Sequence, residues 1–286
     1  MALLEFIKRR NEAQGDEEMP FVEHLEALRW HLIRAAVAVI VCAIVIFIFS
    51  DFFVDDIVFG PTKPDFITKK WLCDIGQKVG VGESLCFKDL ETRFQETTMT
   101  GQFVASFTVA FIGGLVLAFP YVFWELWRFV RPALSNKEKK KTTGIIFWVS
   151  VLFFIGVAFG YFILTPLMVN FYFSYKLSDI IDIRPTFSDY IENLGYTTIG
   201  IGLLFQMPLL ILLLARTGLV TSKMLRRYRR HAIVVIVVAA AIITPTTDPF
   251  SLAVVSVPLA LLYEVSVSLA ARAEKNKLEE EDPEWE

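Results

Sequence analysis

Apolar residues are gathered into long blocks along the chain, and charged residues fall mainly in the gaps between the blocks. A window of about 19 residues finds six apolar blocks, at 32–53, 103–124, 144–167, 194–215, 231–244 and 250–271. A helix needs about 20 apolar residues to cross the hydrocarbon core of a bilayer. The first four blocks meet that length and the sixth is close to it. The pattern therefore predicts an all-α membrane protein with six transmembrane helices.

The fifth block, 231–244, is too short to cross a bilayer of full thickness. Pro245 and Pro249 follow it and preclude one continuous helix through the last two blocks. Either the bilayer thins at this point or the last two helices form a shallow hairpin. We therefore expect the last two helices to be short.

The charged gaps predict the orientation of the chain in the membrane. Two gaps, 125–141 and 216–230, are strongly basic, whereas the gap 168–193 has more acids than bases. Basic loops face the cytoplasm, so both basic gaps and, with six spans, both termini are expected on that side. The first outside loop, 54–100, is long enough to form a cap over the outer mouth of the bundle.

Three parts follow from this topology. Residues 1–31 form a cytoplasmic N-terminal region, 32–271 a six-span membrane domain, and 272–286 a charged cytoplasmic tail, of which we expect 274–286 to be disordered. Residues 1–31 are highly charged and lack the short apolar stretch of a cleavable signal peptide. The first apolar block is therefore expected to remain as a membrane span.

The spans are poor in chemically active side chains. Arg34, Glu125 and Glu264 stand at the predicted cytoplasmic edges, where we expect them to reach the headgroups. Gln206 is the only strongly polar side chain deep in a span. A small-solute channel or transporter built on proline-bent spans is one alternative, but ion-coupled transporters usually place a carboxylate in the membrane. Neither a zinc-hydrolase His-Glu-x-x-His pattern nor a Gly-x-Ser-x-Gly elbow is present, so we expect no enzyme and no cofactor.

Three cysteines occur in the chain. Cys42 lies inside the first apolar block, where it is expected to pack as a small buried apolar side chain. Cys73 and Cys86 share the first outside loop, where they could close a small disulfide ring or remain two free thiols. A metal site needs more ligands than two thiols, and that loop contains no histidine.

A short interfacial helix is predicted just before the first span. Its apolar residues recur on one helical face: Phe21, Leu25, Leu28 and Leu32. Glu23 and Glu26 are three residues apart and so are neighbours on the helix surface. These acids either bind a partner or simply pair with Arg29 or solvate the start of the helix.

The first cytoplasmic loop contains one acid among lysines, Glu138. Ser135 and Glu138 have the spacing of a helix capping box, in which each side chain binds the other residue's backbone amide. The alternative is that Glu138 is an anionic contact for a partner molecule.

Six segments, in order along residues 20–270, together resemble the TatC family, the multispanning core of the twin-arginine translocase. The segments are Phe21-x-Glu23-His24-Leu25-x-x-Leu28-Arg29; Phe119-Pro120 with Trp127-x-Phe129-x-x-Pro132-x-Leu134-x-x-x-Glu138; Phe153-x-x-Gly156-x-x-Phe159-x-Tyr161-Phe162-x-x-x-Pro166; Phe205-x-x-Pro208; Arg229-x-x-Ala232 running into Thr244-Pro245; and Asp248-Pro249 with Pro258 and Leu262-Tyr263-Glu264.

The resemblance implies a receptor for folded proteins that carry paired arginines in their signal peptides. The residues implied to bind the signal peptide at the cytoplasmic face are Glu23, Glu26, Phe129 and Glu138. Gln206 and Pro208 are implied to contact single-span subunits of the TatA and TatB type. The resemblance also implies an oligomer in the bacterial cytoplasmic membrane, driven by the proton motive force, with no nucleotide and no nucleic acid as partner.

Three positions depart from the family pattern. The family commonly has a second glutamate after Glu26, where this chain has Ala27. Gln206 often aligns with glutamate in relatives, and an amide cannot carry a proton as a carboxylate does. The turn that begins at Thr244 is one residue longer than the commonest form.

Overall fold

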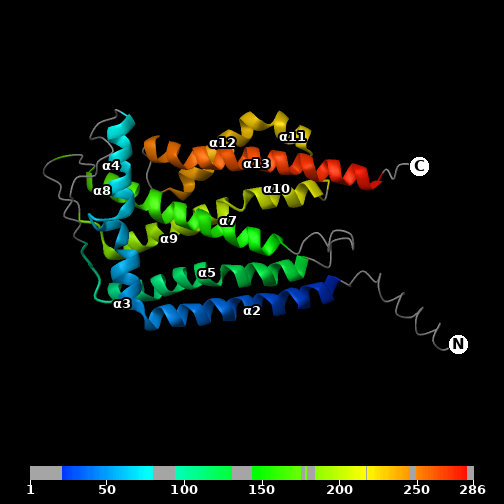
Figure 1. Ribbon diagram of the computed structural model, residues 1–286. Helices are drawn as coiled ribbons and strands as arrows, with labels where there is room; N and C mark the ends of the chain where they lie inside the picture. The colour runs from blue at the N-terminus through cyan, green and yellow to red at the C-terminus, as the bar shows by residue number, and fades with distance from the viewer. Residues whose placement is uncertain are drawn as a thin grey trace.

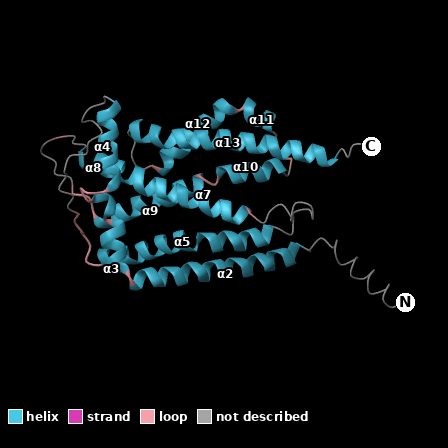
Figure 2. Cartoon of the chain, in the orientation of Figure 1, coloured by secondary structure: helices cyan, strands magenta, loops and turns pink. Residues whose placement is uncertain are grey.

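The structure is a computed structural model that describes residues 21–79, 94–130, 144–174, 178, 184–216, 218–244 and 249–281. Within these ranges every regular element is helical, and one isolated β-bridge pairs Gln95 with Thr186. The long helices lie side by side as a bundle (Figures 1 and 2).

The N-terminal half of the bundle consists of α2 (Phe21–Ile48), α3 (Ser50–Phe52), η1 (Phe53–Val58), η2 (Gly60–Thr62), α4 (Ile67–Val79) and α5 (Gly101–Val130). The C-terminal half consists of α7 (Ile145–Phe159), η5 (Gly160–Leu164), α8 (Thr165–Ser174), α9 (Phe187–Leu204), α10 (Met207–Arg216), α11 (Ser222–Arg227), α12 (Arg229–Ile243) and α13 (Pro249–Glu281).

Five helical stretches among the described residues are long and apolar enough to cross a membrane: Glu26–Ile48, Gly101–Val130, Ile145–Ser174, Phe187–Arg216 and Ser251–Lys275. They correspond to five of the six apolar blocks, which confirms an all-helical membrane protein. The helix of the remaining block, α12, has 15 residues and is short, as expected.

The last helix is not short, and this expectation was wrong. α13 has 33 residues and continues through Glu281, so most of the tail predicted to be disordered is helical. The tail is rich in alanine, arginine, glutamate, lysine and leucine, which all favour helix. Glu274 also accepts hydrogen bonds from the backbone amide and hydroxyl of Ser222, at 2.5 and 2.6 Å.

The predicted interfacial helix is likewise not a separate element. α2 runs without a break from Phe21 to Ile48, across the expected boundary at residue 31. This stretch contains neither proline nor glycine, so nothing in its backbone chemistry ends the helix at the start of the apolar block.

Small residues let the helices approach closely at two junctions. A Cβ at Gly114 of α5 would come within 2.7 Å of the backbone nitrogen of Ala43 on α2. A Cβ at Gly156 of α7 would come within 2.8 Å of the Cα of Gly202 on α9. Such contacts need a residue without a side chain, as is common where membrane helices pack. Phe119 and Phe153 link the two junctions by stacking at 3.5 Å between ring centroids.

Prolines shape two of the spans. The fourth span is interrupted at Phe205 and Gln206, between α9 and α10, because Pro208 lacks an amide and cannot continue the hydrogen-bond ladder. In the third span, the wide helical turn η5 precedes Pro166, and the Thr165 hydroxyl donates to the carbonyl of Gly160 at 3.0 Å.

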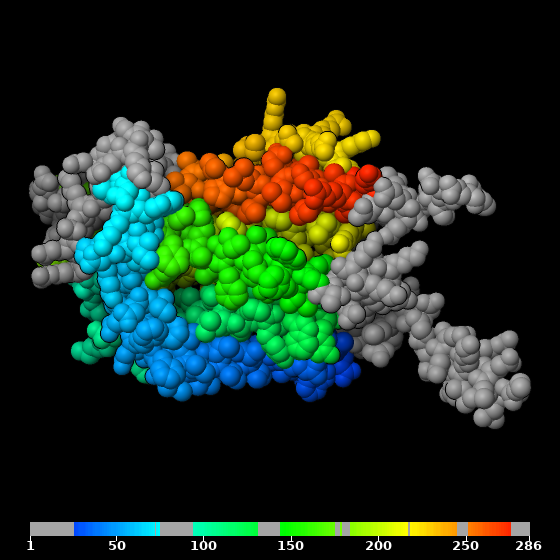
Figure 3. Space-filling model, viewed as in Figure 1, coloured from blue at the N-terminus to red at the C-terminus, as the bar shows by residue number. Residues whose placement is uncertain are grey.

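The segment after the first span folds across one end of the bundle, where α4 stands across the long helices (Figures 1 and 3). Two tyrosine hydroxyls hold η1 in place. Tyr161 donates to the carbonyl of Ile57, and Tyr190 donates to the carbonyl of Val58, each at 2.6 Å. The first loop therefore caps the bundle, as its length led us to expect.

Candidate functional site

A polar cluster lies where α2 and α5 meet, at the end of the bundle opposite the cap (Figure 1). His31 Nδ1 and Glu125 Oε2 are 2.5 Å apart. The Tyr121 hydroxyl donates to Glu125 Oε1 at 3.1 Å, and Arg128 Nη1 lies 3.9 Å from the same oxygen. Both carboxylate oxygens of Glu125 therefore have partners.

Glu125 is 1% exposed, so it does not reach toward the headgroups as the sequence suggested. A carboxylate in an apolar helix is costly unless a partner satisfies it, and His31 on α2 supplies that partner. The His31–Glu125 pair is the feature that sequence reasoning missed. Its available signal was an acid placed between Trp124 and Trp127, where only a partner on another helix would satisfy it.

The pair positions one predicted site residue from each helix. On α5, the Phe129 ring contacts His31 edge to face, with 6.3 Å between ring centroids. On α2, Glu26 lies between one and two turns before His31 and is exposed. The alternative ion pair between Glu26 and Arg29 is absent among the described contacts, and both side chains are exposed. Glu26 and Phe129 therefore lie at the same end of one locked helix pair.

The other two predicted signal-peptide residues, Glu23 and Glu138, are not described in full. Glu23 lies in the first turn of α2, but its side chain is outside the described residues. Glu138 is wholly outside them, so its choice between capping box and partner contact remains open. Both remain predictions.

Gln206 is buried between α7 and the break in the fourth span. Its Nε2 donates to the carbonyls of Val149 and Gly202 at 3.3 and 3.4 Å. Its Oε1 is buried and has no hydrogen-bond partner among the described residues. Pro208, nearby in the chain, lines an apolar groove of about 410 Å³ between α7, α10 and α13. An acceptor inside a membrane protein is costly to leave without a donor.

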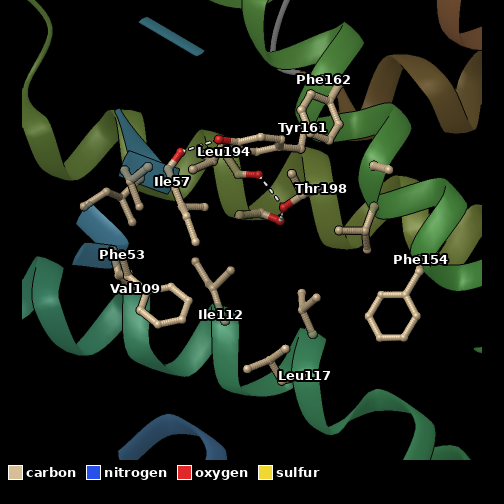
Figure 4. A pocket seen from close by; sticks show the side chains of 17 residues that line it. Phe53, Ile57, Val109, Ile112, Leu117, Phe154, Tyr161, Phe162, Leu194 and Thr198 are labelled. Carbon is tan, nitrogen blue, oxygen red and sulfur yellow. Dashed lines mark hydrogen bonds between the residues drawn. The ribbon is translucent and has the colours of Figure 1, made fainter. Parts of the chain in front are cut away.

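A larger apolar cavity of about 560 Å³ lies between α5, α7, η5 and α9, with η1 at one end (Figure 4). Its few polar groups are already bonded within the chain. The Thr198 hydroxyl donates to the carbonyls of Leu194 and Gly195, and Tyr161 donates to Ile57. The cavity thus presents an apolar surface, which suits an apolar chain and not a polar solute.

The described residues contain no cluster of metal ligands and no cluster of free thiols. No group of three or more His, Cys, Asp or Glu is placed to hold a metal ion in this part of the chain. Cys42 is a free thiol. Cys73 takes part in a disulfide, whereas Cys86, its predicted partner, lies outside the described residues.

Comparison with known proteins places this geometry in a family. Residues 23–258 match the model of the family described as Sec-independent protein translocase protein (TatC). The TatC protein of Blattabacterium sp. subsp. Periplaneta americana is 38% identical over 261 residues, which cover 91% of this chain and 98% of that protein. The TatC protein of Desulforapulum autotrophicum is 29% identical over 270 residues, which cover 94% and 91%.

Two solved structures share the fold. A crystal structure of the twin arginine translocase receptor TatC superposes with a TM-score of 0.63 at 25% identity, covering 88% of this chain and 99% of that one. A second, of the receptor in DDM, gives a TM-score of 0.66 at 25% identity, covering 86% and 99%. The family match takes in most of the chain and both halves of the bundle, so the chain belongs to the TatC family of Sec-independent protein translocase proteins.

Proposed function

We propose that this protein binds the twin-arginine signal peptides of folded cargo at its cytoplasmic face and nucleates the translocation complex driven by the proton motive force. The observation that carries the proposal is the position of Glu26 and Phe129 at one end of the α2–α5 pair, locked together by His31 and Glu125. The structural neighbours described as twin arginine translocase receptors support the same function.

In this proposal Glu23, Glu26 and Glu138 bind the two guanidinium groups of the signal peptide. Each guanidinium can form two parallel hydrogen bonds with one carboxylate, which the ammonium of lysine cannot do. The ring of Phe129 forms the wall of the site beside these acids. The rigid His31–Glu125 connection fixes the distance between the α2 and α5 contributions before the peptide arrives, which reduces the entropy lost on binding.

The apolar part of the signal peptide then packs as a helix against the spans, which is a common mode of peptide recognition. The apolar cavity between α5, α7 and α9 offers a surface of suitable chemistry for this segment.

The proposal places six spans in the bacterial cytoplasmic membrane, with α12 as the short one and both termini in the cytoplasm. Residues 1–31 and 272–286 then lie on the cytoplasmic side, and α4 caps the outer end. The basic gaps 125–141 and 216–230 support this orientation. The packing of α12 against α13 supports α12 as the remaining span.

Partner subunits are part of the same proposal. Gln206 and Pro208 contact single-span subunits of the TatA and TatB type in an oligomeric complex. The buried Oε1 of Gln206 supports this role, because a donor from a partner helix would satisfy it. Cys73 and Cys86 are proposed to form the disulfide that fastens the cap. Mass spectrometry with and without reductant tests that bond, because closing the disulfide removes two hydrogen atoms. Equal masses for the two samples would mean free thiols.

The test of the receptor function is a photo-crosslinking residue at Phe129 in native membranes. A signal peptide with Arg-Arg should crosslink there, and the same peptide with Lys-Lys should crosslink far less. Equal crosslinking of the two peptides, or none with either, would remove Phe129 from the recognition site.

A second experiment addresses Glu138. Glu138→Ala and Glu138→Lys should abolish export of twin-arginine cargo while the protein still inserts into the membrane at its normal level. Normal export by both variants would leave Glu138 as a helix cap only.

A further inference from the structure

A group of unpaired cations projects from the outer side of α11 and the first turn of α12. We name the four residues of this group the α11 basic face: Lys223, Arg226, Arg227 and Arg230. All four are exposed, and none forms an ion pair with an acid in the described part of the chain. The neighbouring Arg229 differs, because it donates to Glu264 of α13 at 2.8 Å.

The basic face is held in a fixed position by its inner side. The Tyr263 hydroxyl of α13 donates to the carbonyl of Leu225 at 2.8 Å. Glu274 of α13 accepts hydrogen bonds from both the amide and the hydroxyl of Ser222. The Thr221 side chain accepts from the Met224 amide at 3.3 Å, which caps α11. A loop that served only to orient the chain during insertion would need positive charge but no such fixed platform.

Exposed apolar side chains lie among these cations. Leu219 is 72% exposed, and Met224 and Tyr228 are each 48% exposed. The segment lies on the flank of α13, toward the end of the bundle where α2 begins and α5 ends (Figure 1). Side chains of this region stand away from the rest of the molecule (Figure 3). Cations combined with exposed apolar groups at the edge of a membrane bundle are typical of a surface that enters the headgroup layer.

We propose that the α11 basic face is a binding site for the headgroups of anionic phospholipids. The guanidinium groups of Arg226 and Arg227 bind the headgroup phosphate by charge-assisted hydrogen bonds. Leu219, Met224 and Tyr228 enter the boundary with the acyl chains. This site lies apart from the signal-peptide residues and does not depend on the proposed receptor function. Its consequence is that α11 and the short helix α12 are anchored to the cytoplasmic leaflet when that leaflet is anionic.

The test uses the full-length protein purified in mixed micelles that contain equal amounts of phosphatidylglycerol and phosphatidylcholine. Native mass spectrometry measures how much of each lipid remains bound. The wild-type protein should retain phosphatidylglycerol preferentially. Arg226→Gln with Arg227→Gln should weaken that binding roughly 25-fold, because each basic residue near an anionic surface contributes about fivefold. Arg226→Lys with Arg227→Lys should retain most of the preference, since charge is kept.

The matched control removes two cations at the other end of the molecule. Lys63 and Lys70 are exposed and pair with Asp56 and Asp65, so Lys63→Gln with Lys70→Gln makes the same change in net charge. This variant should retain phosphatidylglycerol as the wild type does. Equal loss in both variants, or equal retention of the two lipids by the wild type, would overturn the proposal.

A competition experiment separates a lipid site from a general phosphate site. An excess of inorganic phosphate at constant ionic strength should leave the bound phosphatidylglycerol in place, because free phosphate lacks the acyl chains that contact the apolar residues. Full displacement of the lipid by phosphate would assign the arginines to a free anion instead. Melting temperatures of all variants should match that of the wild type, since the four side chains are exposed; a drop confined to the arginine variants would assign them a role in folding and overturn the proposal.

Discussion

Two helix junctions in this protein each bury one strongly polar side chain, and they satisfy it differently. At the α2–α5 junction both oxygens of Glu125 have partners: His31 on one oxygen, and Tyr121 and Arg128 on the other. At the junction of α7 with the broken fourth span, Gln206 uses its amide nitrogen twice, at 3.3 and 3.4 Å, and leaves Oε1 without a partner.

The helix pairs that contain these two groups pack alike. Gly114 brings α5 against α2, and Gly156 brings α7 against α9, in both places with no room for a Cβ. Close packing alone therefore does not distinguish the two junctions. Their buried polar groups do: both oxygens of Glu125 have partners, whereas the buried Oε1 of Gln206 has none among the described residues.

The largest expected effect on stability comes from removing His31 from its pair with Glu125 between α2 and α5. His31→Ala leaves the Glu125 carboxylate buried without its nearest partner, and removing one member of a buried pair costs about 3–5 kcal/mol. The free energy of unfolding, measured by denaturant titration of the protein in detergent, should fall by about that amount.

The double variant His31→Leu with Glu125→Leu is the control for this prediction. It replaces the pair by apolar side chains, so it should recover much of the lost stability. The losses in the free energy of unfolding of His31→Leu and Glu125→Leu are measured separately for comparison. If the loss in the double variant equalled the sum of these two losses, the pair would not act as one buried unit.

The second effect tests whether the two junctions are packed equally tightly. Gly114→Val and Gly156→Val should each destabilise the protein by roughly 1–3 kcal/mol, because the added side chain meets backbone atoms that cannot move away. Gly144→Val is the matched control, since the nearest atom to its Cβ would be on Trp148 at 3.9 Å. Melting temperatures that fall for Gly114→Val alone would show that the α7–α9 junction is looser than its geometry indicates.

The sequence predicted the parts of the fold that depend on local composition. The length of an apolar block and the proline that follows it decide whether a helix can span the membrane, so the first four spans and the short α12 could be predicted. The last apolar block was also recognised, but its helix, α13, was wrongly expected to be short. The helical tail beyond residue 272 was missed because its charges suggested disorder, whereas its residues favour helix and Glu274 binds Ser222 of α11.

The candidate site was predicted only where one residue was conspicuous by itself. Gln206 stood out because it is the polar side chain deep in an apolar block. Glu125 did not, because its partner His31 is 94 residues away in the chain and the pair exists only once α2 and α5 pack. The sequence signals only an acid between Trp124 and Trp127 and does not identify His31 as its partner, and the acid was therefore assigned to the headgroup region.

A smaller effect on stability is expected at Gln206, where α7 meets the broken fourth span. Gln206→Leu removes two long hydrogen bonds but also removes a buried acceptor without a partner, so the free energy of unfolding should change by less than about 1 kcal/mol. The amount of single-span subunit that co-purifies from membranes should nevertheless fall clearly. A stable variant with undiminished co-purification would contradict the role of Gln206 as a partner contact.

The smallest effect concerns a polar group outside the spans, Glu96, and shows what a satisfied carboxylate contributes when it is only half-buried. Glu96 accepts hydrogen bonds from the amides of Thr97 and Thr98 and from the hydroxyls of Thr98 and Ser188. The bond from the Thr98 amide is the main cause that lowers the pKa of Glu96 below its ordinary value of 4.5, and partial burial opposes it.

A lowered pKa in the folded state means that Glu96 stabilises the fold fully above a pH of about 4.5 and loses this contribution as the pH falls through the folded-state pKa. The melting temperature of the wild type should therefore drop slightly more than that of Glu96→Gln over this acidic range, because the amide does not titrate. Asp189→Asn serves as a control in the same first turn of α9, since the exposed Asp189 side chain accepts none of the bonds that hold Glu96. If Glu96→Gln and the wild type melted with the same pH dependence while Asp189→Asn differed, the half-buried carboxylate of Glu96 would contribute nothing to the attachment of α9.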